Sequence, residues 1–128
     1  MTIARQRLGH EAETLVAAEL SRQGMVVIER NARFAEPRGE LDLVALDDET
    51  LVFVEVKALR PGSRLGPERP ALAVDRRKQL RLRALARAWL AARGGALPRY
   101  AAIRFDVVGL RLEPGGQVVE WDHIRAAF

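Results

Sequence analysis

Apolar residues at helical spacing occur near the start of the chain and again in its second half. The first series predicts an amphipathic helix over 8–23, which Gly24 would end. Its apolar stripe consists of Leu8, Ala12, Leu15, Val16 and Leu20. The second series predicts a helix over 71–93, with leucines and Trp89 on one face and arginines on another.

Shorter apolar segments, several with alternating polar residues, predict five strands. They are expected at 25–34, at 39–57 (a hairpin of two strands), at 101–112 and at 117–121. The stretch RPGSRLGPERP has three prolines, two glycines and no periodicity, so we expect a mobile loop over 60–70. The order of these elements predicts a mixed sheet with helices packed on it.

The predicted hairpin, GELDLVALDDETLVFVEVK, carries charged residues at one end of two apolar strands. A tight turn would place Leu46 opposite Leu51. If this register continues along both strands, two pairs of charged residues face each other on the same side of the hairpin. Those pairs are Asp42 with Glu55 and Glu40 with Lys57. Facing carboxylates with Cβ atoms about 4.5 to 5.5 Å apart repel each other. A cation is therefore expected beside them.

Two interpretations explain this charged end. In the first, the facing acids hold Mg²⁺, which takes one or two carboxylates and keeps waters for substrate phosphates. Lys57 would reach the same space as a point charge for a phosphate oxygen. In the second, Glu40 and Lys57 form an ordinary surface ion pair, and the acids are hydrated at the end of the sheet. The second interpretation leaves the facing acids unexplained.

Composition narrows the class of protein. The chain has 128 residues, 48% of them hydrophobic and 30% charged, which predicts one domain over 1–128 with a real core. No apolar run is long enough to span a bilayer, and the first twenty residues do not resemble a secretory signal, so we expect a cytoplasmic protein. Without Cys, thiolate zinc sites are excluded, and we interpret His10 and His123 as structural.

The net charge of +4 is distributed unevenly. The segment from Lys57 to Arg93 has eleven basic residues against two acidic ones, a balance of +9, whereas the remainder has a balance of −5. Such a cationic segment is suited to binding the phosphate backbone of a nucleic acid. A codon bias that favours arginine is the alternative, because 19 of the 21 basic residues are Arg.

Several segments resemble one family of small bacterial proteins. Asp42, a twelve-residue gap and Glu55-Val56-Lys57 resemble the D…ExK signature of the PD-(D/E)xK nucleases. The segments GELDLVA, LVFVEVK, RNAR, RFDVV and HIRAAF resemble the YraN family over nearly the whole chain. That family is similar in fold to archaeal Holliday junction resolvases, and its activity is largely uncharacterised. The resemblance implies an α/β fold, a restriction-endonuclease-like αβα sandwich with a mixed central sheet of about five strands and helices on both faces.

The resemblance also implies roles for the hairpin residues. Asp42 and Glu55 would bind a divalent metal, Mg²⁺ or Mn²⁺, with help from the carbonyl of Val56. Lys57 would assist the attacking water. These roles together imply hydrolysis of a phosphodiester bond.

A glutamate on the first helix belongs to the same family pattern. Counting back from Gly24, Glu13 matches that position, and Ala12 stands where the family usually has Gly. By helical angle, Glu11 and Glu13 flank the apolar stripe almost equally, so periodicity does not choose between them. A solvated acid in the first turns of a helix is the structural alternative for Glu13.

Two further charged positions have alternative interpretations. Lys78 continues the inward face of the second predicted helix, so it points into the cleft or covers the end of the core with its stem. Asp106 shares a strand face with Arg104, and a structural ion pair is the favoured interpretation.

The leading hypothesis is metal-dependent hydrolysis of phosphodiester bonds in DNA, including branched or distorted DNA. The nucleic acid would be bound by Arg60, Arg64, Arg76, Arg77 and Lys78. Symmetric cutting would favour a homodimer. The alternatives are a nucleic-acid-binding module that cleaves nothing and an interaction protein whose basic helix docks an acidic partner.

Overall fold

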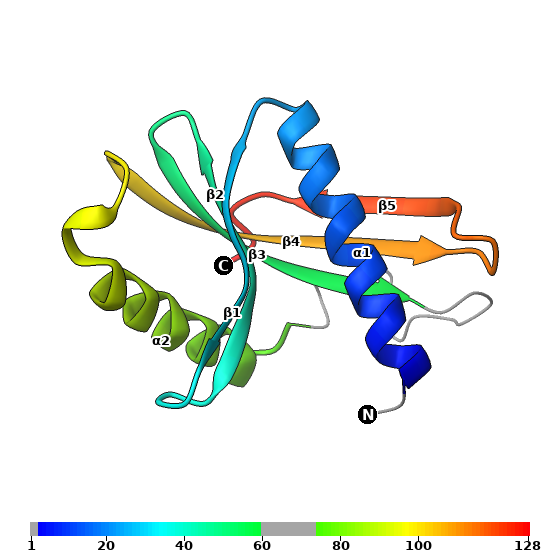
Figure 1. Cartoon of the computed structure of the whole chain (residues 1–128), viewed down its shortest axis with the longest axis horizontal. Coiled ribbons are helices and arrows are strands. Elements are labelled where there is room, and N and C mark those ends of the chain that lie inside the picture. Colours follow the sequence, from blue (N-terminus) through cyan, green and yellow to red (C-terminus); the bar gives the residue numbers. More distant parts are fainter. Residues whose placement is uncertain (1–2, 60–73) are drawn as a thin grey trace.

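The computed structural model describes residues 3–59 and 74–128 of the chain (Figure 1). Its elements are α1 (Ile3–Arg22), β1 (Val26–Phe34), β2 (Gly39–Asp47), β3 (Thr50–Leu59), α2 (Arg76–Arg93), the short 3₁₀ helix η2 (Gly94–Ala96), β4 (Ala102–Leu112) and β5 (Val118–Ile124). The predicted order of helices and strands is confirmed.

The five strands form one mixed sheet in the order β1-β2-β3-β4-β5. Strands β3 and β4 pair in parallel, and the other neighbouring strands pair antiparallel. Parallel neighbours need a crossover connection, and α2 lies within it. The first turn of α2 lies beside the middle of β3, because Lys78 in that turn forms an ion pair with Glu55.

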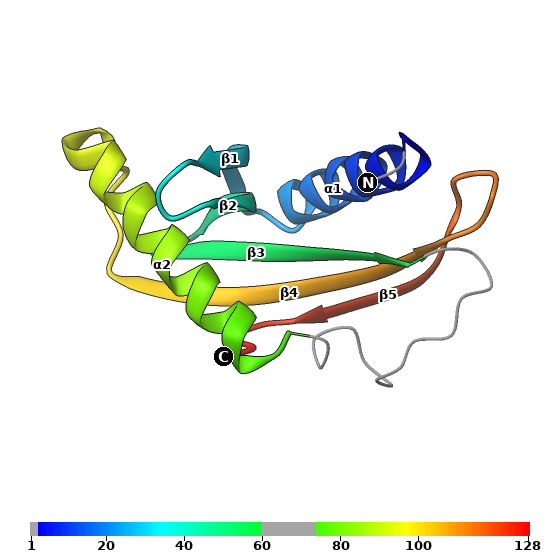
Figure 2. The ribbon, with the colours of Figure 1, turned by 90° about the horizontal axis from the view of Figure 1, so that it is seen from below.

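The two helices cover opposite faces of the sheet. Phe53 of β3 packs in the cluster beneath α2 with Leu85 and Trp89. Its neighbours Val52 and Val54 pack in the cluster beneath α1. Successive strand residues point to opposite faces, so the two clusters lie on opposite sides. Both views show the helices well apart (Figure 2). The predicted αβα sandwich is confirmed, and it is consistent with a restriction-endonuclease-like fold.

The hairpin of β2 and β3 has the predicted register near its turn. From the turn outward, the pairs include Leu46–Leu51, Ala45–Val52, Val44–Phe53 and Leu43–Val54. Beyond the last of these, β2 separates from β3 and continues to pair with β1, as far as Gly39 opposite Phe34. The charged residues therefore lie where the two strands diverge.

The helix boundaries differ from the predicted ones at their starts. Helix α1 begins at Ile3 rather than at residue 8, because the helix-favouring residues before Leu8 extend it. Helix α2 begins at Arg76, since the Asp75 side chain accepts the Lys78 N–H at 2.8 Å and caps the first turn. The predicted loop over 60–70 lies outside the described residues. No helix within 3–59 and 74–128 is long and apolar enough to cross a membrane.

Candidate active site

Asp42 lies at the point where β2 leaves β3. Its Oδ2 accepts a hydrogen bond of 2.8 Å from the Val56 N–H. The carboxylate thus satisfies a backbone donor that has no partner on β2 once the two strands diverge. This contact fixes the Asp42 carboxylate against β3, next to Glu55.

Asp42 and Glu55 form an acid pair in which Glu55 is only 6% exposed and Asp42 is half-buried. Burial, a hydrogen bond with Glu55 and the charge of Glu55 raise the pKa of Asp42 to about 9. Burial would also raise the pKa of Glu55, but the hydrogen bond from Asp42 and the ammonium of Lys78 lower it below its usual value. At neutral pH the pair therefore shares one proton and carries one negative charge.

The ammonium groups of two lysines lie close to the carboxylate of Glu55. Nζ of Lys78, in the first turn of α2, lies 2.6 Å from Glu55 Oε2, and Nζ of Lys57 lies 3.7 Å from the same oxygen. Burial and the nearby Lys78 lower the pKa of Lys57. Burial would lower the pKa of Lys78 too, but Glu55 raises it overall. Of the two interpretations of Lys78, the structure supports the one in which its ammonium points into the site.

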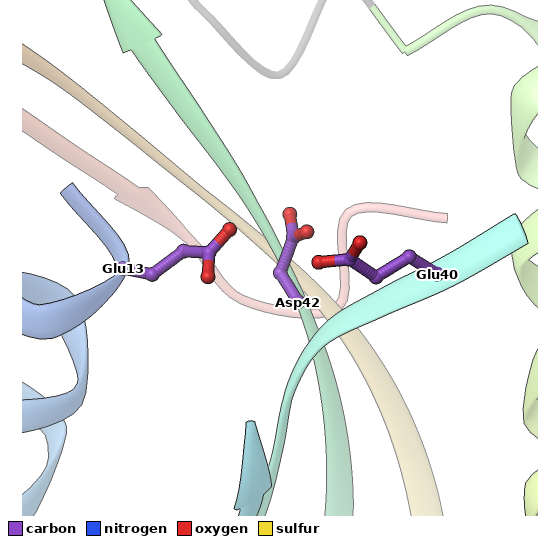
Figure 3. Close-up of side chains that lie close together, drawn as sticks. All are labelled: Glu13, Glu40 and Asp42. Atoms are coloured by element: carbon purple, nitrogen blue, oxygen red, sulfur yellow. The ribbon is translucent and has the colours of Figure 1, made fainter. Parts of the chain in front are cut away.

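A second group of carboxylates converges on Asp42. Glu13 of α1 and Glu40 of β2 point toward it from two directions (Figure 3). One oxygen from each of the three residues lies within 4.8 Å of the other two. Burial, followed by the charge of Glu40, raises the pKa of Glu13. Oε2 of Glu13 is buried and has no hydrogen-bond partner among the described residues.

The structure places Glu13, and not Glu11, at this cluster. Ala12 is fully buried beneath α1, and Glu11 on its other side is exposed. The side chain of Asn31 on β1 also acts on Glu13 and lowers its pKa, against the effect of burial. Asn31 has a φ of 53°, a left-handed conformation that Asn tolerates better than most residues.

Glu40 does not face Lys57, so that part of the predicted register is wrong. Glu40 pairs with Arg33 of β1, and Arg33 Nε lies 3.3 Å from Glu40 Oε2. The physical reason is the divergence of β2 from β3 beyond Leu43, after which β2 residues follow the register of β1.

The residues predicted to contact nucleic acid are only partly described. Arg76 and Arg77 are exposed in the first turn of α2, directly before Lys78. Neither guanidinium has an ion pair or hydrogen bond with any residue in 3–59 or 74–128. Arg60 and Arg64 lie outside the described residues, so their role stays a prediction.

Asp106 belongs to a separate buried network on β4 and β5. Its two oxygens accept hydrogen bonds of 2.8 and 3.1 Å from Arg104, as predicted. His123 Nε2 lies 2.9 Å from Asp106 Oδ2, and the Ala126 N–H donates to Oδ1 at 3.0 Å. Burial would raise the pKa of Asp106, but these contacts lower it. The network anchors the C-terminal residues to β4, and the predicted ion pair between Arg104 and Asp106 is confirmed.

Two members of the site were missed by sequence reasoning. Glu40 was assigned to an ion pair with Lys57, and Asn31 had no role within the segment RNAR. A usable signal existed for Glu40, because the E-x-D spacing places its carboxylate on the same strand face as that of Asp42. No comparable signal existed for Asn31, since its contact depends on the left-handed backbone.

Comparison with known proteins places the chain in a family. The uncharacterised protein family UPF0102 matches residues 12–110, which include all the acids and lysines of the site. The UPF0102 protein of Moorella thermoacetica is 41% identical over 128 residues and is covered completely, as is this chain. That of Nocardia farcinica is 44% identical over 124 residues, 97% of this chain and 91% of that protein. That of Dictyoglomus thermophilum is 32% identical over 123 residues, 96% of this chain and 98% of that protein. The resemblance to the YraN family is thereby confirmed, and the chain belongs to UPF0102.

Proposed function

We propose that this protein is a metal-dependent nuclease that hydrolyses phosphodiester bonds in DNA, including branched or distorted DNA. The position of Asp42 carries the proposal. Its carboxylate is hydrogen-bonded to Glu55 and also lies within the cluster formed with Glu13 and Glu40. A site that only bound phosphate would have no use for four converging acids, since like charges repel the ligand.

The donor set fits a hard divalent cation. Asp42 and Glu55, with the carbonyl of Val56, would hold Mg²⁺ or Mn²⁺, and Glu13 and Glu40 would supply further carboxylate oxygens. The buried Glu13 Oε2 supports this fit, because a buried oxygen without a hydrogen-bond donor gains most from a cation. A bound cation of this kind polarises a phosphodiester and lowers the pKa of a bound water.

The lysines supply the remaining chemistry from the chain itself. Lys57 lies beside Glu55 at the C-terminal half of β3, where it would orient the attacking water and stabilise charge that develops on the phosphate. Burial and the nearby Lys78 lower the pKa of Lys57, which makes its neutral amine more accessible, and a neutral amine can accept a proton from that water. Arg76 and Arg77 would contact the DNA backbone from the first turn of α2.

Cleavage assays with matched variants test this function. Purified protein is incubated with branched, single-stranded and duplex DNA in Mg²⁺ or Mn²⁺, and with EDTA. Asp42→Asn and Lys57→Met should each lower cleavage by about 100-fold or more. Asp48→Asn is the control, because Asp48 is exposed in the β2–β3 turn and its φ of 56° suits Asn. Cleavage that survives in both site variants would reject the proposed site.

The same assays distinguish a module that binds without cleaving. That alternative predicts salt-sensitive DNA binding, no turnover with either cation, and unchanged affinity in Asp42→Asn. The proposed nuclease predicts turnover that depends on the cation and on Asp42.

A further inference from the structure

Lys78 takes an unusual position relative to the proposed cation ligands. Its ammonium lies 2.6 Å from Glu55 Oε2, whereas the ammonium of Lys57 lies 3.7 Å from that oxygen. Glu55 is therefore the point where the acid cluster and the basic helix α2 meet. The negative charge of Glu55 is already balanced by the ammonium of Lys78, which is not part of the D…ExK signature.

We propose that Lys78 competes with the divalent cation for Glu55. Lys78 is then a positioning residue: it must leave Glu55 before the carboxylate can bind the cation, and after leaving it faces the substrate phosphate. This inference rests on the proposed function, because it takes Glu55 as a metal ligand.

The geometry places the two cations in competition for one oxygen, Glu55 Oε2. A hard cation such as Mg²⁺ binds a carboxylate oxygen at about 2.0 to 2.1 Å. An ammonium 2.6 Å from the same oxygen would then lie within a few ångströms of a doubly charged ion. The repulsion at such a distance is large even in partly hydrated surroundings. Lys78 must therefore swing away when the cation binds Glu55.

Lys78 is able to move in this way, because its backbone is fixed by the helix cap and its ammonium is held by the contact with Glu55. The Asp75 carboxylate accepts its N–H at 2.8 Å, so the position of its Cα depends on the helix cap. Its side chain is 37% exposed, compared with 27% for Lys57. A released Lys78 ammonium would reach the solvent beside Arg76 and Arg77, where the DNA backbone is proposed to lie.

The other contacts between acids and basic residues at the site do not create the same competition. Arg33 lies 3.3 Å from Glu40 Oε2, but its side chain is 81% exposed, so this contact is easily exchanged for water. Lys57 belongs to β3 and stands farther from Glu55 than Lys78 does. Lys78 is thus the residue whose removal should change cation affinity most.

Direct titration with Mn²⁺ tests the competition without any cleavage assay. Calorimetry would give the dissociation constant of Mn²⁺ for the wild type, Lys78→Met, Lys78→Arg and Arg77→Gln. We expect Lys78→Met to bind Mn²⁺ about three- to tenfold more tightly, because a half-exposed ion pair is lost. Lys78→Arg should retain the wild-type affinity. Arg77→Gln removes the same charge one residue away and should change affinity by less than about twofold.

A double-mutant cycle separates competition at Glu55 from a general effect of charge. In the Glu55→Gln background Lys78 has no carboxylate to occupy, so adding Lys78→Met should no longer change Mn²⁺ affinity. Thermal unfolding of each variant would show that it is folded. Cleavage by Lys78→Met should fall even though its cation affinity rises, which a merely structural role would not produce.

The possible failures are distinguishable. If Lys78→Met binds Mn²⁺ no more tightly than Arg77→Gln, or if its effect persists in Glu55→Gln, Lys78 does not compete for Glu55 and the inference is overturned. The proposed function survives that result, provided that the wild type binds Mn²⁺ and Asp42→Asn does not. If the folded wild type binds no Mn²⁺, both the inference and the proposed metal site fail.

Discussion

The carboxyl group of Asp42 is held among acids from β2, β3 and α1. The Val56 N–H fixes one of its oxygens, and Glu55 shares its proton. This environment disfavours a bare carboxylate and favours a proton or a metal ion in its place. Proteins tolerate such local destabilisation where function requires it.

Replacing Asp42 by Asn should stabilise the protein at alkaline pH. The asparagine Oδ1 can accept the Val56 N–H, and its amide can donate to Glu55 as the protonated carboxyl does. The pKa of Asp42 is raised from 3.8 to about 9, so its protonated form favours the fold. This contribution is complete below pH 4 and is lost as pH rises through about 9.

We therefore expect Asp42→Asn to match the wild type near pH 4 and to exceed it by about 2 kcal/mol at pH 9, since the opposite shift of Glu55 offsets part of the gain. Urea unfolding at several pH values measures the difference. A variant less stable than the wild type at pH 9 would contradict the proton-sharing pair.

At the scale of the elements, the start of α2 and the start of β2 determine which residues meet. The Asp75 cap positions the first turn of α2, and Lys78 lies in that turn. At the start of β2, Gly39 lies against Leu85 of α2, so a Cβ added at Gly39 would stand 3.0 Å from Leu85 Cδ1. The contact between Gly39 and Leu85 places α2 next to β2, and the cap determines where Lys78 leaves the helix.

Loss of the helix cap should lower stability. Asp75→Ala leaves the Lys78 N–H without its side-chain acceptor, and we expect a loss of about 1 kcal/mol in the free energy of unfolding. Asp75→Asn retains an acceptor oxygen and serves as the control. Equal stability of the two variants in chemical denaturation would show that the cap is unimportant.

A methyl group at Gly39 should also be destabilising. Gly39→Ala forces Leu85 to shift and adds backbone strain at a φ of 153°, so we expect a cost of about 1 to 2 kcal/mol. Gly115→Ala is the matched control, because nothing lies within 4 Å of its added Cβ. Thermal unfolding of the two variants gives the comparison, and an equal effect would refute the close packing.

The hairpin shows which strand pairings can be predicted from the alternation of side chains and from the turn. They predicted the pairing of Leu46 with Leu51, because a tight turn leaves little freedom in register. They failed for Glu40, because the divergence of β2 from β3 depends on tertiary twist and on the Asp42–Val56 contact. The sequence placed Lys78 on the inward face of a helix. Its contact with Glu55 could not be predicted, because it depends on where Asp75 begins that helix.

At the scale of the whole molecule, the acid cluster is separate from the arginines of α2. The acid cluster lies where β2 and β3 diverge, next to Glu13 of α1, whereas a series of exposed arginines lies along α2. The sequence predicted this segregation through its block of +9 from Lys57 to Arg93. It did not predict that Lys78 of α2 meets the acid cluster at Glu55, because that contact depends on where α2 packs against the sheet.

DNA binding should therefore depend strongly on salt and on the first turn of α2. Arg76→Gln and Arg77→Gln should each weaken binding and reduce the slope of log K against log salt by about one, whatever the DNA sequence. Fluorescence anisotropy with labelled DNA at several salt concentrations measures this slope. Arg22→Gln is the control, because Arg22 is engaged by Glu19 at the end of α1. Slopes unchanged in both α2 variants would show that DNA does not bind there.

The site itself is tested most directly by a crystal structure of the protein soaked with Mn²⁺, measured at the manganese absorption edge. We expect an anomalous peak within bonding distance of an Asp42 carboxylate oxygen, with at least one other acid of the site as a ligand. A well-occupied crystal with no peak at Asp42, and with Asp42 still hydrogen-bonded to Glu55, would contradict the proposed metal site.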